Sequence, residues 1–458
     1  MSELSQNTDK GLERRIRKHV HAQRHTFECH VPAGFSELGL RTAESILERT
    51  LSADEKSQTK VSIEQGKIRI EKAPFETLHA LLIEGLIFSE IKIRIHKTRC
   101  QTEQKFQQIL TDIDWPLWLP AASAHALEVR ADSLNSQIYH EGRLKSQFIA
   151  FIEKSIFTER SENKDEQNIS KPSFAIDLNL KRDVLEIFLS MSGRDYWKRG
   201  HKQTFEHAAP LREDIAACLI QRVYEISSRQ LKVNTPTVVL NPFCGTGTLL
   251  HEAALHITGL AHSLSDISRW PYFWLPFCKQ KSFHHALKTY LNALSLKEYH
   301  PNRSQIHYIG EDLQPALCQA TRRWFDDLSS KADLNANADV QEKDSCQKGL
   351  NLQAGELNSK SAVWIFANPP FGIRLSNAFQ GGDETLYRSF GQRLKDLVAH
   401  LKRTSTPVCG VVLCPTESSW RILQRSLTDC SQVCEHFTLG GHDIRAFYFF
   451  TRTNHRRT

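Results

Sequence analysis

The sequence lacks the features that would place it in a membrane or in a disulfide-bonded scaffold. No apolar run approaches the roughly 18 residues that a spanning helix needs, and the first residues lack the apolar core of a signal peptide. The 11 cysteines are odd in number, scattered, and without a Cys-x-x-Cys pair. This usage argues against a disulfide framework or a tetrahedral zinc site and fits a reducing compartment. We therefore expect a cytoplasmic protein with no membrane contact and no bound metal.

The net positive charge of the chain is modest, but the basic residues are unevenly distributed along it. The net charge is +7 over 458 residues, a length that suits two or three domains. Between Lys10 and His25 only Glu13 opposes six cations, which are Lys10, Arg14, Arg15, Arg17, Lys18 and Arg24. Such a run is either a phosphate-contacting arm or a solvated tail or amphipathic surface helix, and both interpretations stay open.

A second basic cluster, residues 194–202, interleaves cations with Tyr196 and Trp197. Aromatic rings between cations suit base stacking combined with phosphate contacts, which makes Lys198 and Arg199 candidates for RNA contacts. A structural role for Arg199 is an equal alternative.

A strand, a glycine turn and a helix follow one another after residue 237. The β-branched run 237–240 predicts a buried strand, and residues 249–255 predict a helix. Between them lie Asn241, Pro242, Phe243, Cys244, Gly245, Thr246, Gly247 and Thr248. The glycines permit a tight turn and a close approach of the backbone to a ligand, as at the first turn of a doubly wound nucleotide site. The turn lacks the lysine of a phosphate loop and the third glycine of a dinucleotide fingerprint.

The next expected strand, residues 306–312, ends in two acids. Asp312 is the candidate for contact with the ribose hydroxyls of an adenosine group, and Glu311 is its competitor. Either acid is also suited to capping the helix that starts near Pro315.

The most informative motif is Asn368, Pro369, Pro370 and Phe371, which follows the apolar run 363–367. The prolines have no N–H groups, so nearby carbonyls are not consumed in regular ladders. The Asn368 amide oxygen and the Pro369 carbonyl can then accept both hydrogens of one amino group, while Phe371 stacks on the base. The alternative is a proline-rich turn after a core strand.

Together these residues resemble the THUMP-domain, S-adenosylmethionine-dependent methyltransferases that modify guanine N2 in RNA. The similarity spans nearly all of residues 27–450, with specific motifs from Arg199 through the glycine turn and Asn368-Pro369-Pro370-Phe371-Gly372 to Gly391, and looser ones in the N-terminal half. It implies S-adenosylmethionine bound by Pro210, Asn241, Phe243, Gly245, Thr246, Gly247, Asp312 and Glu356. It also implies RNA contacts from Arg130, Arg143 and Lys145.

The sequence departs from the family at two places. Family members usually carry Asp where Asn241 stands, so a charged contact near the methionine end of the cofactor is missing or supplied elsewhere. The acid expected near the adenine is assigned to Glu356, and residues 329–361 are polar enough to predict an insertion or flexible loop.

The predicted architecture is α/β, with a doubly wound Rossmann-like methyltransferase domain preceded by an α+β RNA-binding region. We expect a basic, poorly ordered arm at 1–26, a ferredoxin-like module at 27–97, a THUMP domain at 98–190 and the methyltransferase domain at 191–458. Residues 408–414 should form a late central strand, and residues 437–450, broken by Gly440-Gly441, should give the closing antiparallel pair of the sheet.

The predicted activity is methyl transfer to the exocyclic N2 amine of a guanine in 23S ribosomal RNA, by a monomer. A transfer-RNA guanine-N2 methyltransferase is the first alternative. A non-catalytic RNA-binding or ribosome-assembly factor with a vestigial cofactor site is the second.

Overall fold

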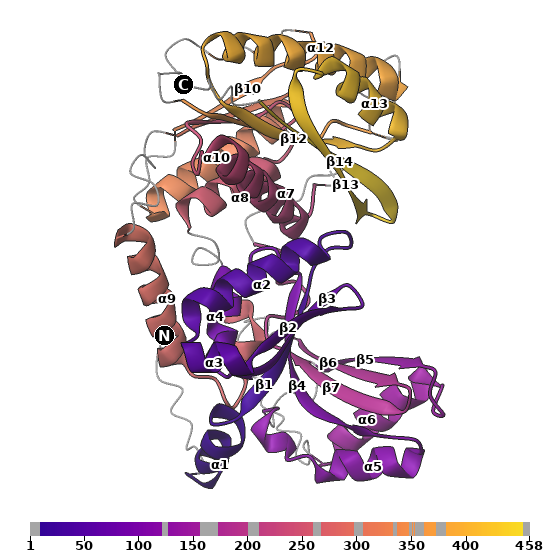
Figure 1. The fold of residues 1–458 in the computed structure, drawn as a ribbon. Coiled ribbons are helices and arrows are strands. Elements are labelled where there is room, and N and C mark those ends of the chain that lie inside the picture. Colours follow the sequence, from indigo (N-terminus) through magenta and orange to yellow (C-terminus); the bar gives the residue numbers. More distant parts are fainter. Residues whose placement is uncertain are drawn as a thin grey trace. The chain divides into compact units, whose positions relative to one another are not determined.

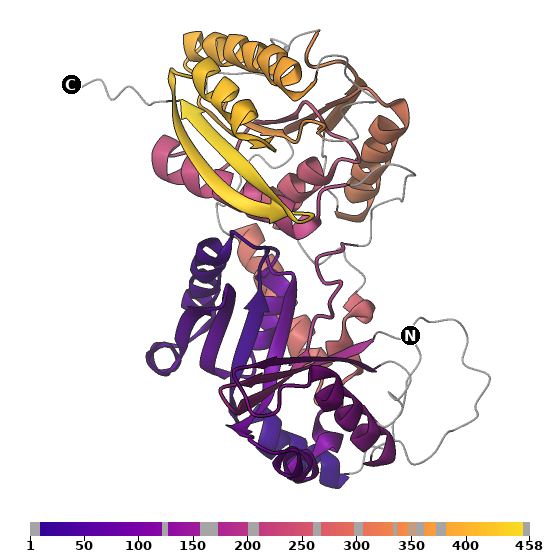
Figure 2. The same ribbon diagram turned by 90° about the vertical axis from the view of Figure 1, so that its right-hand side faces the viewer.

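The computed structural model describes residues 10–120, 127–155, 173–199, 210–259, 267–296, 306–332, 337–347, 350, 352, 361–371 and 382–451. These residues fall into two compact units (Figure 1, Figure 2). Those within Met1–Val31, Gly39–Trp197 and Asp266–Thr289 form the N-terminal unit. Those within Pro32–Leu38, Lys198–Ser265 and Tyr290–Thr458 form the C-terminal unit.

The N-terminal unit contains, within the described residues, a seven-stranded sheet of order β2-β3-β1-β4-β7-β6-β5. Only β5 and β6 pair in parallel. Its strands are β1 (Arg24–His30), β2 (Lys60–Glu64), β3 (Lys67–Pro74), β4 (Glu90–Arg99), β5 (Leu127–Leu134), β6 (Phe174–Lys181) and β7 (Val184–Ser190). The helices are α1 (Lys10–Ile16), η1 (Arg17–His21), α2 (Ser36–Thr50), α3 (Ala53–Gln58), α4 (Thr77–Glu84), α5 (Glu103–Asp112), η2 (Trp115–Leu117) and α6 (Glu141–Ser155).

One continuous sheet joins the segments expected as two modules, 27–97 and 98–190. Strand β4, the last of the first segment, pairs antiparallel with β7 from Lys92↔Ser190 to Arg99↔Val184. The strands of the two segments form a single sheet rather than two. Backbone pairing between the segments therefore makes them one structural unit.

The two faces of this sheet differ in chemistry because alternate residues of its strands point to opposite sides. Ile91 and Ile93 of β4 are apolar and fully buried, whereas Lys92 between them is charged and 1% exposed. Lys92 forms ion pairs with Glu90, at 3.1 Å, and with Asp177 of β6. Burial acts to lower the pKa of Lys92, but the two carboxylates outweigh it and raise that pKa. A buried charge is tolerated here because it is paired.

Residues 267–289 pack in the N-terminal unit, although the division made from sequence put them in the 191–458 domain. This segment contains η6 (Ile267–Arg269), η7 (Pro271–Trp274) and the first part of α9 (Gln280–Leu296). The Tyr272 hydroxyl is 2.7 Å from His79 Nε2, and the Lys279 ammonium is 2.6 Å from Glu76 Oε1. The boundary at residue 191 therefore does not separate the two units cleanly.

The C-terminal unit contains, in its described part, a second seven-stranded sheet, of order β10-β9-β8-β11-β12-β14-β13. The strands are β8 (Val238–Asn241), β9 (His307–Asp312), β10 (Asn337–Glu342), β11 (Val363–Ala367), β12 (Val408–Cys414), β13 (Cys430–Leu439) and β14 (His442–Thr451). The helices are α7 (Glu213–Ile226), η4 (Ser227–Leu231), α8 (Thr248–Thr258), α10 (Pro315–Ala332), α12 (Gly382–Arg403) and α13 (Glu417–Ser426). The five strands β10, β9, β8, β11 and β12, in this order across the sheet, run parallel. Strand β14 pairs antiparallel with β12 and β13. The expected closing pair around Gly440-Gly441 is confirmed.

The prediction that residues 329–361 form an insertion or loop is wrong in part. Helix α10 continues to Ala332, and Asn337–Glu342 forms β10, which pairs in parallel with β9 from Asn337↔His307 to Glu342↔Asp312. An edge strand shares its hydrogen bonds with one neighbour only and tolerates polar residues, so its pattern resembles that of a loop.

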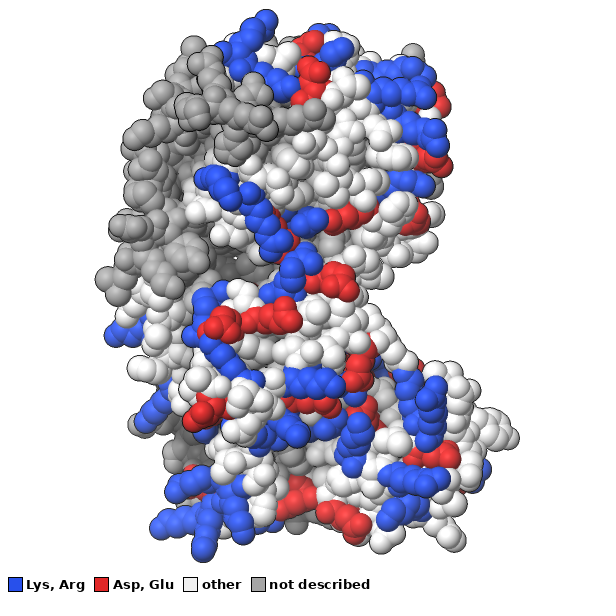
Figure 3. Space-filling view, in the orientation of Figure 1, with Lys and Arg blue, Asp and Glu red and all other residues white. Residues whose placement is uncertain are grey.

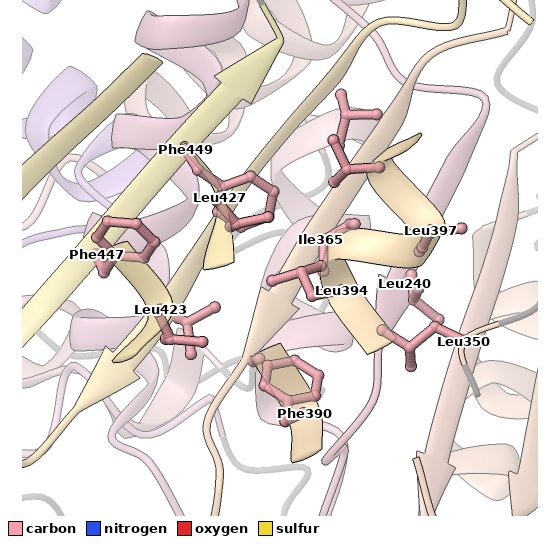
Figure 4. Packing of buried hydrophobic residues seen from close by; sticks show 14 of the residues in the cluster. Leu240, Leu350, Ile365, Phe390, Leu394, Leu397, Leu423, Leu427, Phe447 and Phe449 are labelled. Atoms are coloured by element: carbon pink, nitrogen blue, oxygen red, sulfur yellow. The ribbon is translucent and has the colours of Figure 1, made fainter. Parts of the chain in front are cut away.

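The core of the C-terminal unit fixes the ends of the parallel strands. Ile365 of β11 and Leu240 of β8 pack with Leu394 and Leu397 of α12, and all are at most 4% exposed (Figure 4). Strand β11 is apolar throughout, and β8 is apolar up to its last residue, Asn241, because helices cover both faces of a parallel sheet. The first polar side chains therefore occur where these strands end.

All 11 cysteines lie in the described part of the chain and are free thiols. None of the helices described is long and apolar enough to cross a membrane.

Candidate active site

The site is built where the order of the parallel strands reverses. Strand β8 lies between β9 and β11 in the sheet. From β8 the chain adds β9 and β10 on one side, and it then crosses to the other side of β8 to add β11 and β12. Because Ile365 is paired with Leu240 in parallel register, Asn241 and Asn368 follow at the same edge of the sheet. The carboxyl ends of strands at such a switch point are where α/β proteins bind ligands.

The turn after β8 depends on its glycines. Gly245 and Gly247 adopt φ values of +53° and +81°, a region that side chains disfavour. A Cβ on Gly247 would lie 2.5 Å from His251 Nε2, whereas no atom of the described residues lies within 4 Å of a Cβ on Gly245. Gly247 is therefore required by packing, and Gly245 borders open space that a ligand can use.

Asp312 holds this turn in place. Its Oδ2 accepts a hydrogen bond from the Gly245 N–H at 2.9 Å, and its Oδ1 accepts one from the Gln314 N–H at 3.0 Å. Burial raises the pKa of the Asp312 carboxyl, and these backbone donors only partly oppose that effect. Asp312, expected to contact a ribose, thus also shapes the glycine turn.

Glu311, the competing acid, is committed to other partners. It is 3% exposed, and its two oxygens accept from Lys343 Nζ at 2.5 Å and Ser345 Oγ at 2.6 Å. The Ser345 hydroxyl is also 2.6 Å from the carbonyl oxygen of Pro242. Glu311 therefore ties the end of β10 to the loop after β8, which favours Asp312 as the ligand contact.

Three side chains at this edge have buried polar atoms without a hydrogen-bond partner in the described structure. They are both amide atoms of Asn241, Oγ1 of Thr246 and Oδ1 of Asn368. Asn241 is 1% exposed, so its unmade hydrogen bonds are costly unless a ligand makes them. A polar ligand such as an amino-acid group or an amine fits these donors and acceptors.

The Asn368-Pro369-Pro370-Phe371 segment leaves β11 at this edge. Asn368 is half-buried, Pro369 is buried, and Phe371 is half-buried. Asn368 can therefore meet a ligand through its unpartnered Oδ1. The stacking role of Phe371 remains a prediction.

The remaining predicted cofactor residues are placed as follows. Phe243 packs edge-on against Phe390 of α12, with ring centroids 5.0 Å apart, so its ring is partly used by the core. Pro210 is exposed, and Glu356 lies outside the described residues.

The sequence prediction missed the residues that follow β10. Lys343, Asp344 and Ser345 come directly after it at the carboxyl edge, and Asp344 Oδ1 accepts from the Cys346 N–H at 2.9 Å. The signal that could have found them is the short strand pattern around Val340, which is 2% exposed and precedes a Lys-Asp-Ser run.

The predicted RNA-contacting residues divide into exposed and buried. The side chains of Arg130 and Arg143 are 57% and 61% exposed, although each has a carboxylate partner, and Lys145 and Lys198 are also exposed. Arg199 is different because its side chain has no exposed area and its Nε is 3.3 Å from Glu252 Oε1. The structure therefore corrects the RNA-contact interpretation of Arg199 and favours the structural alternative.

The C-terminal unit has the doubly wound, Rossmann-like α/β fold expected from the sequence. Over the whole chain the fold is similar to that of SMU.472, a putative methyltransferase complexed with SAH, with a TM-score of 0.64 at 16% identity and 94% and 99% of the two chains covered. A possible methylase from Clostridium difficile 630 gives a TM-score of 0.64 at 16% identity, with 95% and 100% covered.

Residues 200–406 match the UPF0020 family model, described as the RMKL-like methyltransferase domain. This match supports the resemblance to a methyltransferase for the catalytic half of the chain.

Curated relatives named "Ribosomal RNA large subunit methyltransferase K/L" are also similar. The protein of Marinomonas sp. (strain MWYL1) is 23% identical over 354 residues, or 76% of this chain and 44% of that protein. The protein of Shewanella pealeana is 27% identical over 315 residues, or 67% and 39%. The chain thus spans less than half the length of these relatives.

Proposed function

We propose that this protein transfers a methyl group from S-adenosylmethionine to the exocyclic N2 amine of a guanine in RNA, with large-subunit ribosomal RNA as the substrate. The observation that carries the proposal is the common edge shared by the glycine turn and Asn368, whose Oδ1 has no partner in the described structure. The curated relatives are named as ribosomal RNA methyltransferases, which supports the choice of RNA.

The cofactor would occupy the edge formed by Gly245, Asn241 and Asp312. The open space beside Gly245 admits it, and the unpartnered amide of Asn241 offers both a donor and an acceptor to its amino-acid end. Asp312 retains acceptor capacity for hydroxyl groups, because each carboxylate oxygen has more than one lone pair.

Asn368 would hold the target amine. Its Oδ1 and the Pro369 carbonyl would accept the two amine hydrogens, which draws the nitrogen towards tetrahedral geometry and aims its lone pair. S-adenosylmethionine supplies the methyl group on sulfur, so the carbon–sulfur bond breaks as the carbon–nitrogen bond forms, and a proton then leaves the nitrogen for solvent. The rate gain would come from alignment and from preorganised acceptors rather than from a strong base.

The target guanine has to leave its stack to reach a pocket of this kind, and Phe371 is the residue placed in sequence to receive its face. The N-terminal unit would supply RNA affinity, as a THUMP-type module does in the family that the sequence resembles. The exposed side chains of Arg143 and Lys145 support this role. A protein that modifies ribosomal RNA would work in the cytoplasm.

A non-catalytic RNA-binding factor is the second candidate, because Asn241 stands where the family usually has an acid. Calorimetry with S-adenosylmethionine separates the two. We expect saturable binding, and no heat at millimolar cofactor would favour the non-catalytic factor.

Substrate choice is tested with labelled cofactor and separated cellular RNAs. We expect label in large-subunit ribosomal RNA, and label confined to transfer RNA would favour the transfer-RNA alternative. One similar structure, from Listeria monocytogenes, is titled a predicted N6-adenine-specific DNA methylase, with a TM-score of 0.61 at 17% identity and 93% and 96% of the two chains covered. Labelled DNA is therefore a necessary comparison.

A further inference from the structure

The basic run near the N-terminus is helical in the described residues, which begin at Lys10. It forms α1 and η1, a helix that ends in a π-turn, and then enters β1. This corrects the expectation of a poorly ordered lead-in for the part of residues 1–26 that the structure describes. We name residues Lys10–His21 the basic helix.

The basic helix is anchored in the N-terminal unit by its apolar side. Ile16 is 6% exposed and Val20 is fully buried. The imidazole Nε2 of His21 is 2.8 Å from the carbonyl oxygen of Phe277, and Arg15 pairs with Asp114 at 2.8 Å. His25, in β1, contacts the helix: its Nε2 lies 2.7 Å from the carbonyl oxygen of Val20. These contacts hold the helix in a fixed orientation.

Its outer side presents a high density of positive charge. The exposed cations on the basic helix are Lys10, Arg14, Arg15, Arg17 and Lys18. Figure 3 shows a group of Lys and Arg side chains at the foot of the N-terminal unit, where Figure 1 places α1. Within Lys10–His21 the only acidic residue is Glu13. A carboxylate-poor, preorganised surface of this kind attracts a polyanion.

The anchoring also decides between two kinds of polyanion. A basic amphipathic helix that binds an anionic membrane inserts its apolar face among the lipids. Here Ile16 and Val20 are buried inside the protein and cannot insert while the unit is folded. What remains exposed is a cationic surface, which suits contact with a phosphate backbone and carries no sequence information.

We infer that the basic helix docks the phosphate backbone of the RNA substrate and contributes affinity but no chemistry. The inference rests on the proposed function for its choice of RNA, and it adds a contact surface outside the cofactor and amine residues. Docking through phosphates predicts a salt-dependent contribution, since each neutralised phosphate releases counterions.

The test compares two variants of the full chain that lose the same charge. The first replaces four exposed cations of the basic helix: Lys10→Ala, Arg14→Ala, Arg17→Ala and Lys18→Ala. The control replaces four exposed cations of α12 and α13: Lys395→Ala, Arg403→Ala, Arg421→Ala and Arg425→Ala. Affinity for transcribed large-subunit ribosomal RNA is measured by filter binding from about 50 to 200 mM salt.

For the basic-helix variant we expect the slope of log K against log salt to become shallower by about 3, at roughly 0.7–0.9 per lost phosphate contact. Its Kd at intermediate salt should rise at least about tenfold above that of the control variant. Glu13→Lys should lower the Kd, which a folding defect would not do. Equal slopes in the two four-residue variants would overturn the inference. So would binding of phosphatidylserine vesicles that depends on the basic helix when RNA binding does not.

Methyl transfer measured on the same preparations separates this inference from the proposed function. The basic-helix variant should have a raised KM for RNA, an unchanged kcat and an unchanged affinity for S-adenosylmethionine. If the unaltered protein makes no methylated guanosine, the proposed function fails. If it does, and KM is the same in the variant and the control, only the docking inference fails.

Discussion

Asp312 at the end of β9 accepts a hydrogen bond from the backbone N–H of Gly245, with 2.9 Å between the nitrogen and Oδ2. The bond joins the end of β9 to the turn that follows the neighbouring parallel strand β8, at the edge where the ligand is proposed to bind. It also places a carboxylate beside the one glycine of the turn that has open space around it. The geometry of the turn and the charge of the site are therefore coupled through a single residue.

This coupling predicts a pH dependence of cofactor affinity. Burial raises the pKa of Asp312, so it takes up its proton at a higher pH than an exposed Asp. As pH falls through that raised pKa, the carboxylate loses acceptor capacity and affinity for S-adenosylmethionine should fall. Calorimetry across the acidic range checks this. An equal pH profile in Asp312→Asn would show that another group is responsible.

The same group should act on stability with the opposite sign. Because its pKa is raised in the folded state, Asp312 favours folding below its ordinary pKa and loses that contribution as pH rises through the folded value. Denaturant unfolding of the unaltered protein and of Asp312→Asn, compared at several pH values, separates the contribution of Asp312 to the free energy of unfolding from those of the other carboxylates.

The two glycines of the turn should respond differently to alanine. Gly245→Ala places a side chain at φ +53° but without a clash, so it should lower the free energy of unfolding by about 1–2 kcal/mol. It should weaken cofactor binding by more than this, because the added methyl group enters the space proposed for the cofactor. Gly247→Ala adds a Cβ 2.7 Å from Thr321 as well as close to His251, so it should destabilise the protein more. Urea unfolding and calorimetry measure both effects. A smaller stability loss for Gly247→Ala would contradict the packing argument.

Asn241 provides a test of where the amino-acid end of the cofactor binds. An Asp at this buried position would be desolvated, so Asn241→Asp should lower the melting temperature without cofactor. The cofactor's ammonium group would pair with it, so S-adenosylmethionine should raise the melting temperature of Asn241→Asp by more than that of the unaltered protein. Equal shifts in the two proteins would mean that the ammonium binds elsewhere. Asn241→Leu, which has no charge, serves as the control.

Arg199 and Lys198 are neighbours with different expected roles. Arg199→Ala breaks the buried ion pair with Glu252 and should cost about 3–5 kcal/mol in the free energy of unfolding. Lys198→Ala removes an exposed charge and should leave stability within about 0.5 kcal/mol. Urea denaturation of both variants makes the comparison. Near-normal stability of Arg199→Ala, with weakened RNA binding, would restore the RNA-contact interpretation.

The parts predicted from sequence are those in which local pattern and environment agree. Strand β11 is fully buried, so its apolar run Val363–Ala367 could be recognised and the motif after it placed at a strand end. The glycine turn was recognisable because positive φ values favour glycine. The antiparallel closing pair followed from Gly440-Gly441 between two strand patterns.

The parts that were missed depend on partners far away in the chain. Strand β10 is held by β9 alone and is polar, so nothing in its own residues distinguished it from a loop. The pairing of β4 with β7 joins segments that look like separate modules. The burial of Arg199 depends on Glu252, and no local pattern shows that the two meet.

The central claim is that Asn368 positions the N2 amine of a guanine for methylation. The most direct measurement is mass spectrometry of nucleosides from RNA incubated with cofactor and either the unaltered protein or Asn368→Ala. We expect N2-methylguanosine from the unaltered protein, and a loss of about 10²–10³-fold in rate for Asn368→Ala with normal cofactor affinity. Recovery of N6-methyladenosine instead, or turnover of Asn368→Ala within a few-fold of normal, would contradict the account.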